Sequence, residues 1–299
     1  MGKRIYGRLG MLAVFLLLAE CVGCGGEPER ATGAAPELVG SLRLEGSSSM
    51  EKAVDGLAEG FMEQYPEVAV TVQFTGSGAG IEAVAEGRAE IGNSSRNLTE
   101  EERARGLTEN VAAIDGIAVC VDAFHGVRDV TKKQLADIYT GRITNWAALG
   151  GEDLPIVVIG REAGSGTREA FETLLGIGEQ CTYANELDST GAVMARIAST
   201  PGAIGYVSFD MVKTDGKGRT GQNVMALRLD GVEAEAENVR NGSYPLCRPF
   251  LMITRGEVSA QEELVQAWFR YVSGEKGREI MTRAGLVMVE KGIDDLSSQ

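Results

Sequence analysis

The stretch VAAIDGIAVCVD, at positions 111–122, decides the fold of this chain. It is long and apolar for a single strand, and a new series of apolar runs and amphipathic segments begins after it, at 131. A second stretch of the same character, LCRPFLMIT at 246–254, follows that series. We interpret the two stretches as strands by which the chain crosses from a first lobe to a second and then returns.

Short apolar runs alternate with amphipathic helical stretches on both sides of these crossings. This alternation is typical of an α/β fold, with mostly parallel sheets flanked by helices. The expected strands are 42–44, 68–74, 89–92, 111–122, 156–159, 204–207, 224–229 and 246–254. The expected helices are 50–65, 81–86, 131–139 and 262–272, with others beginning after Gly166 and after Ser189.

The crossings divide the folded part into a discontinuous and a continuous lobe. We expect lobe 1 to comprise 38–121 plus 248–299, and lobe 2 to comprise 122–247. Two strands joining the lobes form a hinge that permits closure around a ligand. One continuous sheet without a hinge is the alternative.

The N-terminus indicates export from the cytoplasm. Three basic residues precede the apolar run 9–19, which is too short to span a bilayer. We therefore expect a signal peptide at 1–23 and a flexible polar tether at 24–37. Small residues around Cys24 resemble a bacterial lipoprotein processing site, so Cys24 is the expected lipidation site. A plain secreted protein with an incidental cysteine is the alternative.

Charge and cysteine content exclude several function classes. The formal charge is −14. Removal of 1–23, with three basic residues and one acidic residue, leaves −16, which makes nucleic acid an unsuitable partner. One histidine, His125, and no Cys/His cluster argue against a zinc site. Cys120, Cys181 and Cys247 lack CxxC spacing, and we expect free thiols rather than a disulfide.

The candidate binding residues lie in four loops. Each loop is rich in glycine and hydroxyl groups and lies between an expected strand and helix. They are GSSS at 46–49, GSGAG at 76–80, GNSSR at 92–96 and REAGSGTR at 161–168. In a parallel α/β sheet such loops gather at the carboxyl ends of the strands, where helix N-termini present free N–H groups. One such loop alone is ordinary turn and cap chemistry. Four together predict an oxyanion site.

At these residues the chain resembles the phosphate-binding subunit of ATP-driven phosphate importers, a class of periplasmic solute-binding protein. GREAGSGTRE at 160–169 resembles the most specific motif of that family. AIDGIAV (113–119), NW (145–146), STPGAIGYVS (199–208) and YPLCRP (244–249) support it. The resemblance implies a two-lobed fold and an extracytoplasmic, membrane-anchored receptor. It also implies inorganic phosphate as ligand, permease and ATPase subunits as partners, and no catalysis or cofactor.

The resemblance also implies roles for individual residues. Arg161 would offer its guanidinium to phosphate oxygens, and Ser165, Gly166 and Thr167 would donate from a hydroxyl, an amide and a helix start. From lobe 1, the expected donors are Ser48, Ser49, Ser77 and Ser95.

Two of the lobe 1 positions leave alternatives open. Ser95 stands where some family members have an aspartate, which would repel sulfate. A hydroxyl can accept a phosphate proton, so we retain phosphate over sulfate. Arg96 either adds a second positive charge to the site or pairs with an acidic neighbour.

Other functions remain open at the level of sequence. A receptor for sulfate, molybdate or tungstate would share the fold and the donor-rich loops, and a sensor or adhesin could retain the fold without transport. Ser49-Met50-Glu51-Lys52 also fits the S-x-x-K pattern of penicillin-recognising serine hydrolases. The other two motifs of those enzymes are matched only loosely and lie too close together here, which disfavours an enzyme.

Overall fold

The computed structural model describes residues 38–123, 126–212 and 223–288. By its internal contacts the chain divides into Met1–Pro36 and Glu37–Gln299, and the described residues belong to the second unit. The expected signal peptide, tether, Cys24 and His125 lie outside the described residues. Among the described helices, none is both long enough and apolar enough to cross a membrane.

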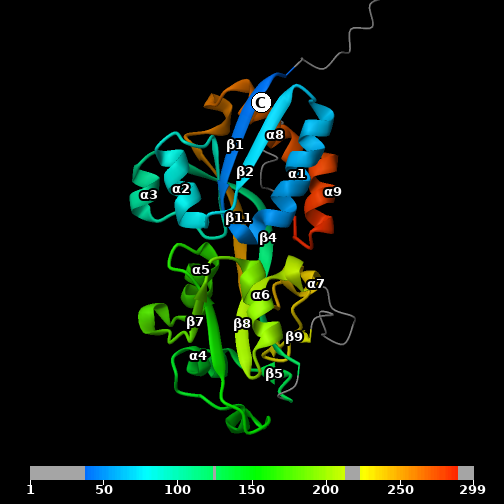
Figure 1. The fold of residues 1–299 in the computed structure, drawn as a ribbon. Helices are drawn as coiled ribbons and strands as arrows, with labels where there is room; N and C mark the ends of the chain where they lie inside the picture. Colours follow the sequence, from blue (N-terminus) through cyan, green and yellow to red (C-terminus); the bar gives the residue numbers. More distant parts are fainter. Residues whose placement is uncertain (1–37, 124–125, 213–222, 289–299) are drawn as a thin grey trace, which may run out of the picture. The chain divides into compact units, whose positions relative to one another are not determined.

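Strands and helices alternate along most of the described chain (Figure 1). The strands are β1 (Gly40–Gly46), β2 (Val68–Gln73), β3 (Ile91–Ser94), β4 (Leu107–Asp122), β5 (Asp129–Val130), β6 (Val157–Arg161), β7 (Asn185–Leu187), β8 (Ala203–Ser208), β9 (Val224–Ala226), β10 (Arg228–Leu229) and β11 (Cys247–Arg255). The helices are α1 (Glu51–Gln64), α2 (Ser77–Ala85), α3 (Glu100–Ala104), α4 (Lys132–Tyr139), α5 (Gly166–Leu175), α6 (Thr190–Ser199), α7 (Ala236–Arg240), α8 (Glu263–Ser273) and α9 (Glu275–Arg283).

The two long strands expected as crossings are confirmed as β4 and β11. They pair with each other in antiparallel register, from Cys247 opposite Gly116 to Arg255 opposite Leu107. The strand order is β2-β1-β3-β11-β4-β8-β6-β7, so the crossing strands lie in the middle of the path. On one side β1 is parallel to β2 and β3, and on the other β6 is parallel to β7 and β8. Hydrogen bonding is therefore continuous, with a parallel group of strands on each side.

The buried side chains nevertheless form separate cores on the two sides of the crossing. The first core includes Phe61, Trp268 and Phe250, and it joins α1, α8 and α9 to β1 and β2. The second core includes Trp146 and Phe171 and lies among α4, α5, α6 and β8. Along β4 the buried side chains pass from the first core at Ala112 and Ala113 to the second core at 117–121. The expected lobe boundaries at 121/122 and 247/248 remain a prediction.

The uniformly apolar character of β11 follows from burial on both faces. Successive residues of a strand point to opposite faces. Phe250 and Met252 accordingly enter the first core, whereas Leu251 and Ile253 pack against α2 in a smaller cluster. A strand covered on both sides needs no polar alternation, which explains why this stretch stands out in the sequence.

Helix α2 begins at Ser77, four residues before the expected start at 81. Glycines at 76, 78 and 80 conceal it, because glycine disfavours a helix interior. Gly80 is required by close packing: a Cβ there would lie 2.3 Å from the backbone oxygen of Glu45 in β1. The early start places Ser77 at the first turn of the helix.

The three described cysteines are free, as expected. Cys120 is buried, and Cys181 and Cys247 are half-buried. Burial raises the pKa of the Cys120 thiol to about 12, so this thiol stays protonated at neutral pH.

Candidate functional site

The four donor-rich loops lie at the ends of strands or the starts of helices, as the sequence predicts. Ser48 and Ser49 follow β1, Ser95 follows β3, and Ser77 begins α2. Arg161 is the last residue of β6, Ser165 caps α5, and Gly166 and Thr167 begin that helix. All eight residues are buried, and the most accessible of the hydroxyl side chains, Ser48, is only 7% exposed. Each of the eight candidates is therefore shielded from solvent.

Contacts between segments far apart in sequence join the loops. The Ser49 Oγ lies 2.7 Å from the Thr167 Oγ1. The Arg161 Nη2 donates to the Ser48 Oγ at 3.2 Å. A Cβ on Gly166 would lie 2.3 Å from the Ser77 Oγ and 2.9 Å from the Ser95 Oγ, so these two serines lie directly against Gly166. Donors from both sides of the crossing thus face each other.

Arg161 is held rigidly in this region, with an exposed fraction of 1%. Its guanidinium donates to the Leu187 and Asp188 carbonyl oxygens at 3.1 and 3.0 Å, and to the Thr190 Oγ1 at 3.2 Å. Glu162 contributes a carboxylate 3.0 Å away, which partly balances the buried charge. These contacts hold the guanidinium in one orientation.

The side chains of Ser47, Ser77 and Ser95 form a second cluster of hydroxyls. The backbone N–H of Ser95 donates to the Ser77 Oγ at 3.1 Å, and the two side-chain oxygens are 3.2 Å apart. The Ser47 hydroxyl donates to the Ser95 Oγ at 2.9 Å. Since the Ser47–Ser95 and Ser77–Ser95 contacts join hydroxyls to one another, an oxyanion would replace them with shorter, charge-assisted bonds.

Helix α5 adds backbone donors. The first N–H groups of a helix lack intrahelical acceptors and carry a partial positive charge. Gly166 and Thr167 occupy these positions, while the Ser165 side chain accepts from the Arg168 N–H. The combined set of hydroxyls, amides and one guanidinium is suited to a small oxyanion.

Four residues that join this network were absent from the sequence prediction. The Thr190 Oγ1 lies 3.1 Å from the Ser49 Oγ, and Ser47 contacts Ser95. Arg248 donates to the Thr167 Oγ1 at 2.6 Å and forms an ion pair with Asp115. Asp115 and Arg248 lie within AIDGIAV and YPLCRP, Ser47 lies within the loop GSSS, and Thr190 begins the helix expected after Ser189. These sequence features were the signal from which the four residues could have been found.

Arg96 forms ion pairs with acidic neighbours. Its guanidinium lies 2.7 Å from the Glu102 carboxylate and 2.6 Å from that of Glu169. Of the two roles considered for Arg96, the structure shows the pairing with acidic neighbours.

Lys52 does not assist Ser49 as the S-x-x-K pattern requires. Its Nζ donates to the backbone oxygen of Asp210 at 3.3 Å. Ser49 instead contacts Thr167 and Thr190. The arrangement lacks the lysine–serine contact by which such hydrolases activate their nucleophile.

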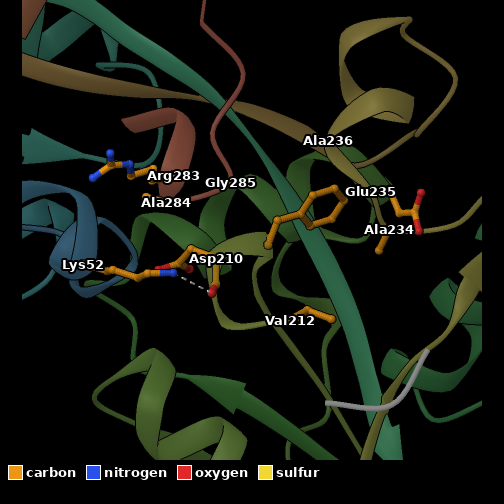
Figure 2. A pocket seen from close by; sticks show the side chains of 10 residues that line it. Lys52, Asp210, Val212, Ala234, Glu235, Ala236, Arg283, Ala284 and Gly285 are labelled. Atoms are coloured by element: carbon orange, nitrogen blue, oxygen red, sulfur yellow. Dashed lines mark hydrogen bonds between the residues drawn. The ribbon is translucent and has the colours of Figure 1, made fainter. Parts of the chain in front are cut away.

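A separate pocket of about 210 Å³ lies beside Lys52 and Asp210 (Figure 2). Glu235 and 283–285 also line it. The Oδ1 atom of Asp210 is buried and has no hydrogen-bond partner among the described residues. Burial raises the pKa of the Asp210 carboxyl from 3.8 to about 7, and repulsion from the Asp115 carboxylate is the second largest cause.

Asp210 should make the stability of the protein depend on pH. The folded protein holds this proton up to about pH 7, whereas the unfolded chain releases it near pH 4, so stability falls as the pH rises through this window. We expect Asp210→Asn to be more stable than the wild type at pH 8, by about 4 kcal/mol because a pKa difference of one corresponds to about 1.4 kcal/mol, and equally stable at pH 4. Urea denaturation at both values measures the difference. An equal difference at the two pH values would contradict the assignment.

Comparison with known proteins finds a matching family and similar relatives. A family model described as the PBP superfamily domain matches residues 31–276. The phosphate-binding protein PstS of Bacillus subtilis is 36% identical over 286 residues, covering 93% of this chain and 92% of the relative.

Two solved structures are similar over most of the chain. A putative phosphate ABC transporter substrate-binding protein from Clostridium perfringens, with bound phosphate, is 38% identical with a TM-score of 0.78, covering 84% of this chain and all of that one. An ABC-type phosphate transport receptor from Vibrio cholerae is 31% identical with a TM-score of 0.68, covering 83% of this chain and all of that one. The two-lobed architecture predicted from the sequence is confirmed by these matches.

Proposed function

Because the chain belongs to the PBP superfamily and, within it, to the phosphate-binding proteins of ABC transporters, we propose that it captures inorganic phosphate between its lobes and delivers it to an importer. The observation that carries this function is the enclosed set of donors, in which Ser48 and Ser49 meet Arg161 and Thr167 from more than 100 residues away. The phosphate-bound relative from Clostridium perfringens supports the same ligand.

Phosphate capture depends on replacing the hydration shell of the ion. An oxyanion leaves water only if many aimed donors take the place of its water molecules. We assign this task to Ser48, Ser49, Ser77, Ser95, Arg161, Ser165, Gly166 and Thr167. Glu162 partly balances Arg161, so hydroxyl and amide dipoles at contact distance supply much of the remaining attraction. The acidic surface acts over about 8–10 Å of screened solvent and opposes binding weakly.

Lobe closure is part of the proposed cycle. A ligand shifts an open–closed equilibrium only through contacts that are better in the closed form. Donors from residues 38–121 and from 122–247 would meet the ion together, with the crossing strands β4 and β11 as hinge. A permease that recognises the closed form would then receive loaded protein only.

Selectivity for phosphate over sulfate is assigned to the hydroxyl of Ser95. A hydroxyl accepts as well as donates, so it can take the proton that phosphate carries and sulfate lacks at neutral pH. Titration calorimetry with phosphate, arsenate, sulfate, molybdate and tungstate tests this function. We expect phosphate binding to persist in millimolar sulfate. Displacement of phosphate by sulfate would favour a receptor for another oxyanion.

Localisation is proposed to be extracytoplasmic, with a lipid on Cys24 and residues 24–37 as a tether. Permease and ATPase subunits are the expected partners, and genes for them beside this one would support transport over sensing. Catalysis is not part of the proposal. A chromogenic β-lactam should therefore remain intact in the presence of the protein.

The lipid anchor is tested separately. Mass spectrometry of the mature protein from its native host should show an N-terminus at Cys24 with added diacylglycerol mass. An unmodified Cys24, or a mature chain that begins elsewhere, would contradict the anchor and leave phosphate capture unaffected.

A further inference from the structure

Arg248 and Asp115 form a buried ion pair on the two crossing strands. They stand opposite each other in the register of β11 and β4, and their exposed fractions are 2% and 1%. The Arg248 Nε and Nη2 atoms donate to the Asp115 Oδ2 at 3.1 and 2.9 Å. The Asp115 Oδ1 accepts from the Ser208 hydroxyl and the Phe209 N–H at 2.9 and 3.3 Å. Both charges are therefore compensated within the fold.

The remaining edge of the guanidinium is directed at the proposed ligand site. The Arg248 Nη1 donates to the Thr167 Oγ1 at 2.6 Å. An arginine can only donate, so the threonine oxygen must accept this bond. The positive charge beside the oxygen then favours a hydroxyl proton that points away from Arg248. The Ser49 Oγ, 2.7 Å from the Thr167 Oγ1, belongs to the proposed set of phosphate donors.

We propose that Arg248, clamped by Asp115, is a positioning residue for phosphate, which fixes the Thr167 hydroxyl as a donor to the ion. The inference rests on the proposed phosphate-binding function. It assigns to Arg248 an action through Thr167, without contact with the ligand.

The position of the pair ties this donor to the hinge. The buried side chains of β4 change from the first core to the second between Ala113 and Ile117, and Asp115 lies between them. The guanidinium also lies over the ring of Phe250, with the carbon at its centre 5.1 Å from the ring centroid. The ion pair therefore lies at the part of the crossing where the two cores meet.

A double-mutant cycle on phosphate affinity tests the inference. Calorimetry would compare the wild type, Arg248→Lys, Thr167→Val and the double variant. A lysine keeps the charge but cannot serve Asp115 and Thr167 with one planar fork. We expect Arg248→Lys to weaken phosphate binding about tenfold in the wild-type background and less than about twofold in the Thr167→Val background. A purely structural arginine would give equal losses in both backgrounds.

Two further variants control for folding. Arg248→Gln combined with Asp115→Asn replaces both charges together and avoids an unpaired buried carboxylate. It should repeat the loss and its dependence on Thr167. Arg255→Lys, on the same strand but bonded to the Val84 carbonyl, should bind phosphate as the wild type does. Thermal unfolding without phosphate checks that each variant is folded.

The outcomes separate this inference from the function on which it rests. A wild type that binds no phosphate overturns both. A wild type that binds, together with a folded Arg248→Lys of equal affinity, overturns the inference alone. Equal losses from Arg248→Lys with and without the Thr167→Val substitution would also overturn it.

Discussion

Arg161→Ala is expected to weaken phosphate binding by at least tenfold. A hydrogen bond to a charged group contributes roughly 1.5–3 kcal/mol, and about 1.4 kcal/mol corresponds to a factor of ten in affinity. The substitution removes the fixed positive charge of the proposed site and leaves Thr190 and Ser48 without their guanidinium donor. Titration calorimetry with inorganic phosphate measures the loss.

Arg142→Ala is the matched control for this variant. Arg142 is an exposed arginine paired with Asp137, so its removal should leave phosphate affinity unchanged. Arg161→Lys should fall between the alanine variant and the wild type, because it keeps a charge but not the planar fork. A folded Arg161→Ala protein with wild-type affinity would refute the role of the guanidinium.

Gly166→Ala is expected to reduce phosphate affinity by about tenfold or more through steric exclusion. The added Cβ would lie 2.3 Å from the Ser77 Oγ and 2.7 Å from the Ser77 Cβ, closer than non-bonded atoms can approach. Overpacking of this kind costs about 1–3 kcal/mol. Because Gly166 and Ser77 lie on opposite sides of the crossing, the clash should oppose closure and spare each core. Phosphate affinity should thus fall while unfolding stability without ligand stays close to that of the wild type.

Gly164→Ala supplies the control within the same loop. Apart from its two chain neighbours, no atom of the described residues lies within 4 Å of a Cβ built at this position. The variant should therefore close and bind phosphate normally. Equal affinity in Gly166→Ala and the wild type would show that Gly166 and Ser77 do not approach each other in the phosphate-bound protein.

Sequence reasoning succeeded where one physical demand dominates a stretch. The long apolar runs at 111–122 and 246–254 became the crossing strands because both faces of β11 are covered. Regular apolar spacing placed α1 and α8 within one residue of their expected ends. Helix α9 was missed because it exposes most of its residues and buries only Gly277 and Met281 completely.

The site was predictable in its motif residues and less so in the residues behind them. Ser77 and Gly166 could be named because their glycine-rich loops resemble motifs of the phosphate-binding family. Thr190 could not, since its contact with Ser49 joins positions 141 residues apart in the chain. Arg248 looks like part of an apolar strand, and its partner Asp115 becomes evident only in the pairing of β4 with β11.

A crystal structure of the protein with bound phosphate tests most directly whether the ion is held between the lobes. The predicted result is a phosphate within hydrogen-bond distance of the Arg161 guanidinium, of hydroxyls among Ser48, Ser49, Ser77 and Ser95, and of the first N–H groups of α5. Phosphate bound by residues of one lobe only, or outside this enclosed set of donors, would contradict it.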